Sequence, residues 1–159
     1  MRFFLLFITL FSFLMTSCSS SKEVFVIKKK VISKTDKIIA NAKSFKGTKY
    51  KFGGITRKGM DCSGLIYTAF KKENIQLPRA SRFMAKEGSK IPLHKAKKGD
   101  LLFFRTNKRS NEINHVGLII SIKNKQIYFI HATTSRGVII SLLSEKYWKN
   151  AFVKAVRVL

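Results

Sequence analysis

The stretch HVGLIISIKNKQIYFIH, residues 115 to 131, decides the fold class of this chain. It is rich in Val, Ile and Phe, and a short polar segment interrupts it, which predicts two β-strands joined by a turn. The same texture recurs before and after it. We therefore expect five strands, at residues 100–105, 115–122, 125–131, 137–142 and 151–158.

Helical patterns precede these strands. Apolar side chains recur there at spacings of three and four, and turn residues separate the patterns. We expect three helices, at residues 35–45, 62–73 and 81–87. Thr35 or Asp36 is expected to cap the first helix and Asp61 the second. Helices followed by strands indicate an α+β domain, with N-terminal helices packed on a largely antiparallel sheet of five to six strands.

The two histidines of the quoted stretch bear on function through their register. If residues 122–124 form a three-residue loop, Ser121 pairs with Lys125, and paired residue numbers sum to 246. His115 and His131 have the same sum, so they would lie directly opposite each other on one face, with Cβ atoms about 5 Å apart. A two-residue turn would instead place them on opposite faces.

The N-terminus has the pattern of an export signal. Residues 3–14 (FFLLFITLFSFL) are too short for a membrane span and match the apolar region of a signal peptide. Small residues precede Cys18, as in a lipoprotein signal. We expect a signal peptide at 1–17, a lipidated Cys18 and flexible tether at 18–34, and one catalytic domain at 35–159. An ordinary cleaved signal and a short uncleaved anchor are alternatives, and each of them still implies export.

The charge balance favours an anionic partner. Lys and Arg number 32 against 8 Asp and Glu, a formal net charge of +24. Such a surface attracts nucleic acid, acidic lipid or a carboxylate-rich polymer. The basic residues are scattered, and neither a zinc finger nor a phosphate-binding loop accompanies them, so we expect no nucleic-acid partner.

Chemistry is expected at Cys62, in the segment MDCSGL. It opens a predicted helix, where backbone N–H groups and the helix dipole stabilise a thiolate and lower the pKa of the thiol. His115 would act as the base and His131 would orient it. A buried structural cysteine and two core histidines are the alternative interpretation. A zinc site would need a further ligand, so we expect no metal and no cofactor.

With these residues in place, the chain resembles the NlpC cell-wall peptidase family, whose members have a papain-like fold. The resemblance covers about residues 35–159 and includes the order DCSGL, HVG and a later His. The matching segments are YKFGG (50–54), DCSGL (61–65), LPRAS (77–81), GDLLFF (99–104), NHVGL (114–118), FIHA (129–132) and Tyr147-Trp148.

The resemblance implies a cysteine endopeptidase that hydrolyses peptidoglycan stem peptides at D-glutamyl–diaminopimelate or D-alanyl–diaminopimelate bonds. It implies Cys62 as nucleophile, His115 as base and His131 as the third polar residue, and it places the substrate-binding residues Tyr50, Asp61 and Ser63 in the cleft. The backbone N–H of Cys62 is the expected oxyanion donor.

Further expectations concern the whole protein. We expect a monomer that is anchored in the outer membrane through Cys18 and faces the periplasm, with peptidoglycan as its substrate. A different papain-like activity, such as an amidase or acyltransferase, remains open. So does a catalytically silent protein that binds the wall.

Overall fold

The computed structural model describes residues 32–107 and 109–159. The predicted signal peptide, Cys18 and most of the predicted tether lie outside these residues. No helix within the described ranges has the length and apolar character needed to cross a bilayer. The helices are α1 (Lys34–Lys43), α2 (Cys62–Lys71), α3 (Ser81–Met84), the short 3₁₀ turn η1 (Leu93–Lys95) and α4 (Lys146–Ala151).

Eight strands are described, in a small hairpin and a six-stranded antiparallel sheet. The hairpin strands are β1 (Ile55–Thr56) and β2 (Gly59–Met60). The sheet strands are β3 (Ser89–Ile91), β4 (Leu101–Phe104), β5 (His115–Lys123), β6 (Gln126–Thr133), β7 (Gly137–Leu142) and β8 (Phe152–Arg157). Their spatial order is β3-β8-β4-β5-β6-β7. The predicted α+β class, with helices first and an antiparallel sheet of five to six strands, is confirmed.

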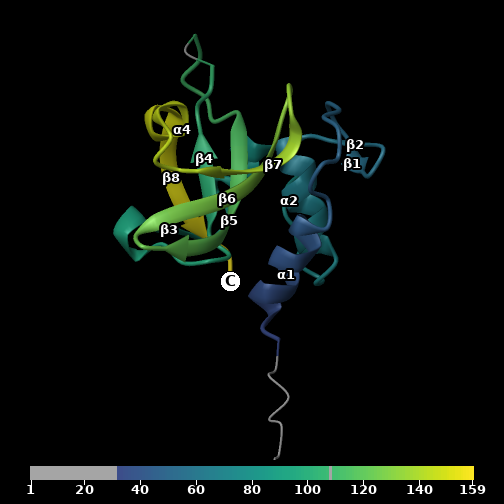
Figure 1. The fold of residues 1–159 in the computed structure, drawn as a ribbon, viewed down its shortest axis with the longest axis horizontal. Coiled ribbons are helices and arrows are strands. Elements are labelled where there is room, and N and C mark those ends of the chain that lie inside the picture. The colour runs from purple at the N-terminus through teal and green to yellow at the C-terminus, as the bar shows by residue number, and fades with distance from the viewer. Residues whose placement is uncertain (1–31, 108) are drawn as a thin grey trace, which may run out of the picture. The chain divides into compact units, whose positions relative to one another are not determined.

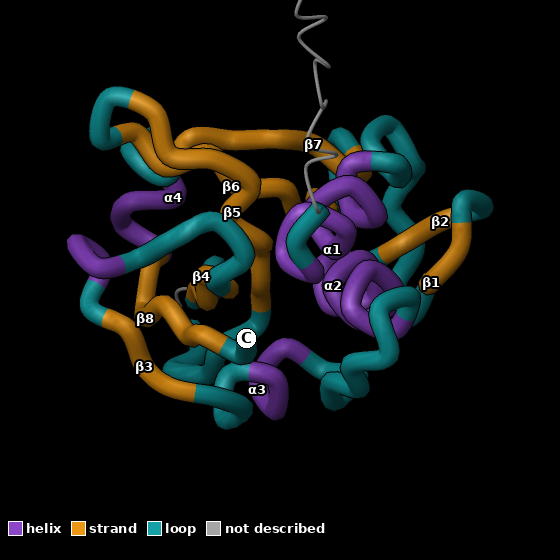
Figure 2. Tube along the Cα trace, turned by 90° about the horizontal axis from the view of Figure 1, so that it is seen from below, coloured by secondary structure: helices purple, strands orange, loops and turns teal. Residues whose placement is uncertain are grey.

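The sheet separates two apolar layers. Figure 1 shows α1 and α2 together on one side of the curved sheet, and Figure 2 shows α4 beyond the sheet from them. The layer under α1 and α2 contains Leu101, Leu118 and Ile130, whereas the layer under α4 contains Phe104 and Phe129. Because successive strand residues point to opposite faces, neighbours on one strand contribute to different layers. The β4 segment Leu101–Phe104 is accordingly buried at every position.

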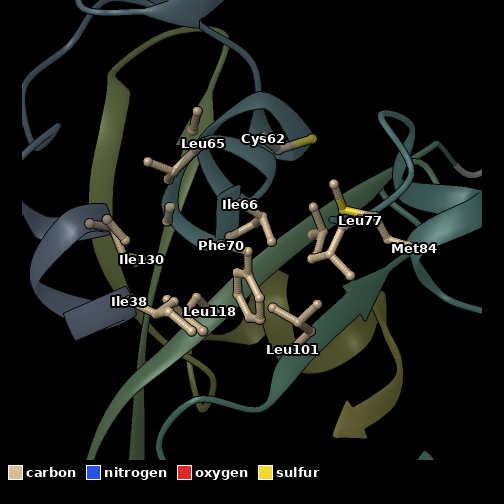
Figure 3. Close-up of a cluster of buried hydrophobic side chains, with 14 of the residues drawn as sticks. Ile38, Cys62, Leu65, Ile66, Phe70, Leu77, Met84, Leu101, Leu118 and Ile130 are labelled. Atoms are coloured by element: carbon tan, nitrogen blue, oxygen red, sulfur yellow. The ribbon is translucent and has the colours of Figure 1, made fainter. Parts of the chain in front are cut away.

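Helix α2 is fixed by the first of these layers. The predicted apolar stripe of this helix, from Leu65 and Ile66 to Ala69 and Phe70, is fully buried. Figure 3 shows Phe70 of this helix directed at Leu101 and Leu118 of the strands, with Cys62 at the start of the same helix. Burial of four such side chains provides several kcal/mol of hydrophobic free energy, at about 25 cal/mol per Å² of apolar surface. The position of Cys62 is thus set by the core.

The hairpin between β5 and β6 differs from the prediction in two compensating ways. The turn has two residues, Asn124 and Lys125, both with positive φ. Paired numbers near the turn therefore sum to 249, as for Lys123 with Gln126. A register shift between Ile119 and Ser121 reduces the sum to 248. An extra residue on one strand reverses the parity, which returns both histidines to one face.

The predicted direct pairing of His115 with His131 is therefore wrong, although the shared face is confirmed. In the observed register Phe129 pairs with Ile119 instead of Gly117. The ring of Phe129 still crosses Gly117, where an added Cβ would collide with it. Continued by the same sum, the register places His131 opposite Gly117, two residues along β5 from His115 and on the same face. Such diagonal neighbours remain within reach of ring side chains.

Element boundaries also differ from the sequence-based expectations. Ser33, not Thr35 or Asp36, caps α1, and its hydroxyl accepts a hydrogen bond from the N–H of Asp36. Asp61 caps α2 as predicted. The helices end earlier than predicted. The short elements β1, β2, β3, η1 and α4 were not predicted, because two to six residues provide too little periodicity for detection.

Candidate active site

Cys62 is placed by the first turn of α2. Asp61 caps the helix by accepting a hydrogen bond at 2.6 Å from the N–H of Gly64. At Gly64 the 50–54 segment passes so close that an added Cβ would collide with the carbonyl oxygen of Gly54. The glycine therefore allows this segment to cross the helix N-terminus and form one wall beside the cysteine.

The surroundings of the thiol favour its neutral form. Burial is the main cause that raises the pKa of Cys62, and the Asp61 carboxylate raises it further. The backbone N–H groups of Val116, Ser63 and Cys62 lower it, as the helix-terminus argument predicted, but burial dominates. The expected net lowering of the pKa is therefore wrong in direction. Desolvation disfavours the charged form of any acid that lacks a counter-charge.

The sulfur lies beside the first residues of β5. Cys62 Sγ contacts the carbonyl oxygen of Asn114 at 4.0 Å. Asn114 immediately precedes His115, so the predicted nucleophile and the predicted base meet where α2 begins and β5 begins. Among the described residues, the hydrogen bonds do not include one between Sγ and a ring nitrogen of His115. Apo geometry of this kind is common at sites where the reacting groups tighten only when substrate binds.

His115 and His131 form a buried chain with Ser141. His115 Nε2 lies 3.0 Å from His131 Nδ1, and His131 Nε2 lies 3.0 Å from Ser141 Oγ. A neutral imidazole has one N–H and one lone pair. If Ser141 Oγ accepts from His131 Nε2–H, then His131 Nδ1 accepts from His115 Nε2–H. This direction leaves the lone pair of His115 on Nδ1, where it can accept a proton.

Aromatic rings enclose both histidines. His115 stacks on Trp148 with centroids 5.2 Å apart, and His131 stacks on Phe129 at 4.6 Å. Burial lowers the pKa of His115 to about 4. Burial, together with the charges of His115 and Arg136, lowers the pKa of His131 to about 2. Both rings are therefore neutral at pH 7, and the resting pair is a thiol with a neutral imidazole.

Arg79 connects Asp61 and Ser63, on the other side of Cys62, through hydrogen bonds. Its guanidinium donates to both oxygens of Asp61, at 3.0 and 2.9 Å, and to Ser63 Oγ at 2.8 Å. The N–H of Gly53 also donates to Asp61, at 2.8 Å. Burial alone would raise the pKa of Asp61, but the hydrogen bonds from Arg79, Gly64 and Gly53 and the charge of Arg79 lower it overall. Asp61 is thus an ionised, fully engaged carboxylate.

Two cavities meet at the cysteine. One, of about 420 Å³, is lined by His115, Arg136, Glu145, Tyr147 and Trp148 among others. The second, of about 450 Å³, is lined by Asp61, Ser63, Arg79 and Ser81 among others. Both include Tyr50, Cys62 and Asn114. Together they form a trough with the nucleophile in the middle, which suits an extended substrate bound across it.

The structure brings together six of the seven residues proposed from sequence. Tyr50, Asp61, Ser63, Cys62 and His115 line the trough, and His131 lies behind His115. The seventh, Cys18, lies outside the described residues. Burial raises the pKa of Tyr50, and the nearby Cys62 and Asp61 raise it further, so its hydroxyl is a neutral donor beside the sulfur. The substrate contacts of Tyr50, Asp61 and Ser63 stay predictions.

Sequence reasoning did not assign roles to Arg79, Ser141 or Trp148. Arg79 follows Pro78 in the LPRAS segment, and an Arg among small residues in a loop was its one available signal. Ser141 looked like any polar residue of an alternating strand. Nothing local to the sequence shows that its hydroxyl lies within hydrogen-bond distance of His131, on the preceding strand. Within the described ranges, no group of three or more His, Cys, Asp or Glu side chains is arranged to hold a metal ion.

A thiol at a helix N-terminus, a neutral histidine on the facing sheet and a polar residue behind it define a papain-like cysteine hydrolase. The pattern of the NlpC/P60 family matches residues 47–157. The chain belongs to the NlpC/P60 family.

The chain is similar to several known proteins of this family. It is 41% identical over 126 residues to the "Probable endopeptidase NlpC homolog" of Haemophilus influenzae, covering 78% of this chain and 63% of that protein. It is 34% identical over 145 residues to the "Murein DD-endopeptidase MepS/Murein LD-carboxypeptidase" of Escherichia coli, covering 91% and 73%. An NlpC/P60 family protein of Bacillus cereus has a similar fold, with a TM-score of 0.70 and 29% identity, covering 79% of this chain and 40% of that one.

Proposed function

We propose that the chain is a cysteine endopeptidase that hydrolyses the stem peptides or crosslinks of peptidoglycan. The observation that carries this proposal is the trough in which Cys62, at the start of α2, shares one cavity with His115. His115 is in turn hydrogen-bonded to His131. The endopeptidase names of the relatives support the same reaction class.

The geometry supports a general-base route. Since both partners are neutral at rest, the thiol proton passes to His115 as Sγ attacks the scissile carbonyl carbon. The carbonyl oxygen becomes an oxyanion, for which the backbone N–H of Cys62 is the proposed donor. The imidazolium then protonates the leaving amine, and an acyl-enzyme remains on Sγ. Water activated by His115 hydrolyses the thioester and restores the thiol.

The bond that is cut is proposed from chemistry and from the relatives. Both bonds expected from the sequence join a D-amino acid to diaminopimelate. The DD-endopeptidase name of the Escherichia coli relative favours the D-alanyl crosslink for this chain. The engaged Asp61 carboxylate, with Arg79 and Ser63, would position the acyl part of the substrate in the cavity that His115 does not line.

Location and attachment belong to the proposal as well. The apolar run 3–14 followed by Cys18 supports export and a lipid anchor, and the two serines after Cys18 support the outer membrane, facing the periplasm. The net charge of +24 would hold such a protein against an anionic wall. Substitution of Cys18 by Ala, followed by membrane fractionation and fatty-acid labelling, tests the anchor separately from catalysis. Labelling that persists without Cys18 would contradict it.

The activity is tested with the full chain and its Cys62→Ala variant. Purified muropeptides, crosslinked and uncrosslinked, are incubated with each protein, and the products are identified by mass spectrometry. Cleavage by the parent alone establishes the nucleophile, and the fragment masses identify the bond. Release of a whole stem peptide from its sugar would instead indicate an amidase. No cleavage by the folded parent would contradict the proposal.

A further inference from the structure

The strands β4 and β5 run between two ends of the domain. β5 begins at His115, beside the trough, and its nine residues end at Lys123. β4 is antiparallel to β5, so the residues that precede β4, 97–99, lie at the same end as Lys123. At about 3.3 Å per residue, Lys123 lies roughly 25 Å along the strand from His115. This end of the sheet is therefore the far end from the trough.

Lysines from three separate segments gather at the far end. Lys97 and Lys98 line a shallow cavity together with Lys123. Lys34 begins α1, and Lys125 belongs to the turn between β5 and β6. We use the name lysine face for these five exposed residues, Lys34, Lys97, Lys98, Lys123 and Lys125.

Acidic side chains at this end leave the lysine face with an excess of positive charge. Asp36 pairs with Lys98 at 2.6 Å, and the buried Asp100 pairs with Arg157 at 2.7 Å. The ion pairs within the described part of the chain include none to the other four lysines of the face. Such a surface attracts an anionic partner.

Exposed apolar side chains lie beside these lysines. Ile122, which is 40% exposed, lines the cavity shared by Lys97 and Lys123. Leu159, which is 45% exposed, lines a neighbouring cavity that also includes Lys97. Ile32, just before α1, is 61% exposed. Lysines interspersed with apolar side chains suit the headgroup region of a membrane, where the lysines meet lipid phosphates and the apolar groups leave water.

The described chain also begins at the far end. Thr35, in the first turn of α1, packs so closely on the 97–99 segment that a Cβ added at Gly99 would collide with its side chain. Figure 1 shows the start of α1 and the end of the chain, marked C, at the same end of the domain. The proposed lipid anchor on Cys18 is joined to the domain through α1. The anchor is therefore attached at the end that carries the lysine face.

We propose that the lysine face docks on anionic phospholipid headgroups of the membrane that holds the anchor. This inference rests on the proposed membrane location and is independent of the peptidase reaction. Each lysine near an anionic lipid surface strengthens such docking by about fivefold. Docking turns the far end of the sheet toward the lipid, so the trough is held roughly 25 Å away, on the side where the wall lies.

Peptidoglycan is the other anionic partner that a basic surface could meet. Its sugars and peptides provide no apolar layer for Ile122 and Leu159, whereas a membrane does. The attachment of the anchor at this end also brings the lysine face to lipid before wall. The observations therefore favour lipid as the partner of this face.

Lysine acetylation of the full chain maps the contact. The protein is inserted through its own N-terminus into vesicles of phosphatidylcholine, or of equal parts phosphatidylcholine and phosphatidylglycerol, and acetylation rates are read site by site by mass spectrometry. We expect Lys97 and Lys123 to react about tenfold more slowly on the mixed vesicles. Lys58, in the turn between β1 and β2, and Lys149, in α4, are exposed at the trough end and should react equally on both. Salt at about 1 M, where the Debye length is about 3 Å, should restore the faster rates.

Paired variants with the same loss of charge separate the face from the net charge. In Lys97→Gln/Lys123→Gln, docking should weaken about 25-fold, so the protection of Lys98 and Lys125 should fall below about twofold. The matched control Lys58→Gln/Lys149→Gln should keep the full protection of the lysine face. An equal loss of protection in both double variants would overturn the proposal, because net charge alone would then explain the binding.

The remaining results also decide the matter. Equal acetylation rates of Lys97 and Lys123 on the two kinds of vesicle would overturn the lysine face. So would protection of these lysines by purified peptidoglycan and not by mixed vesicles, which would assign the face to the wall. A failed anchor is seen separately, as protein that does not float with phosphatidylcholine vesicles, and the mixed vesicles then test the face alone. Loss of peptidase activity does not affect any of these readouts.

Discussion

His115 Nε2 lies 3.0 Å from His131 Nδ1, and His131 Nε2 lies 3.0 Å from Ser141 Oγ. All three side chains are buried. A chain of this kind fixes tautomers, because each neutral ring can donate only once. The proposed base, His115, is therefore oriented by a residue that lines neither of the two cavities at Cys62. Ser141 acts as a positioning residue, through His131, on His115.

Substitution of Ser141 by Ala removes the hydroxyl 3.0 Å from His131 Nε2, which accepts the Nε2–H in the tautomer that leaves the lone pair of His115 on Nδ1. We expect kcat to fall about tenfold with KM unchanged, because the hydrogen bond that orients the ring of His131 is lost and its free energy corresponds to about that factor. Nitrogen chemical shifts of the His131 and His115 rings should show mixed tautomers in the variant. Ser141→Thr, which retains the hydroxyl, should recover most of the activity. Ser121→Ala, on β5, which β6 separates from β7 in the sheet, is the control. A drop in stability without any change in tautomer would show that Ser141 only packs.

Low histidine pKa values predict the acid limb of catalysis. The neutral form of His115 is the proposed base, and burial lowers the pKa of this histidine to about 4. We expect kcat/KM to stay level as pH falls from 7 to 5 and to decline only as pH falls through about 4. This pH dependence is checked by initial rates on a substrate whose leaving group is uncharged. A decline centred near pH 6.5, the ordinary histidine value, would show that His115 is more hydrated than its surroundings indicate.

The same two histidines make folding stability depend on pH. Their folded pKa values lie below the unfolded value of about 6.5, so the unfolded chain binds more protons under mildly acidic conditions. Stability is therefore full above about pH 6.5 and is lost as pH falls. Each ring lowers the free energy of unfolding at pH 5 by about 2 kcal/mol relative to pH 8, and the two rings together lower it by about 4 kcal/mol. Urea unfolding at both pH values measures this difference. In His131→Gln the difference should shrink to about half, and an unchanged difference would assign the effect to other groups.

Much of this site could be predicted from the sequence, and the reason lies in which interactions are local. Asp61 as the cap of α2 and the Cys62 position follow from neighbouring residues, and both are confirmed. The shared face of His115 and His131 was predicted from an incorrect turn. A two-residue turn and a bulge near Ile120 each change the parity, and together they cancel. No pattern in the segment 115–131 indicates the bulge, which is one extra residue on one strand of the pair.

The net effect of burial on the pKa of Cys62 could not be predicted from the sequence either. The helix terminus lowers the pKa of Cys62 as expected, but the surrounding core raises it more. Burial is a property of the whole fold, since residues from α2, β5 and the 50–54 segment all cover the sulfur. Arg79 and Ser141 are similar cases. Each acts across a separation of ten or more residues, on Asp61 and His131 respectively.

The ion pair of Arg79 with Asp61 should contribute more than the exposed ion pair of Lys98 with Asp36. Their partners differ in exposure, with side-chain values of 37% and 10% in the first pair against 54% and 37% in the second. We expect Arg79→Ala to lower the free energy of unfolding by about 1–2 kcal/mol and to raise the pKa of Asp61, because burial then acts unopposed by the guanidinium. Lys98→Ala should cost about 0.5 kcal/mol or less. Equal costs for the two variants would show that the Asp61 site is solvated.

At position 64 the usual preference of a helix for alanine over glycine is reversed. Within an ordinary helix this change would stabilise the chain by about 0.5–1 kcal/mol, because glycine loses more backbone entropy on folding. Here the new Cβ would collide with the carbonyl oxygen of Gly54, which is backbone and cannot rotate away. We expect a net loss of about 2 kcal/mol and a kcat/KM reduced by an order of magnitude or more, because the 50–54 segment must move away from Cys62. Lys71→Ala, on the exposed side of the same helix, is the matched control, and we expect it to change the free energy of unfolding and kcat/KM by almost nothing. A stabilised Gly64→Ala protein with normal activity would show that this segment adapts freely and does not define the cleft.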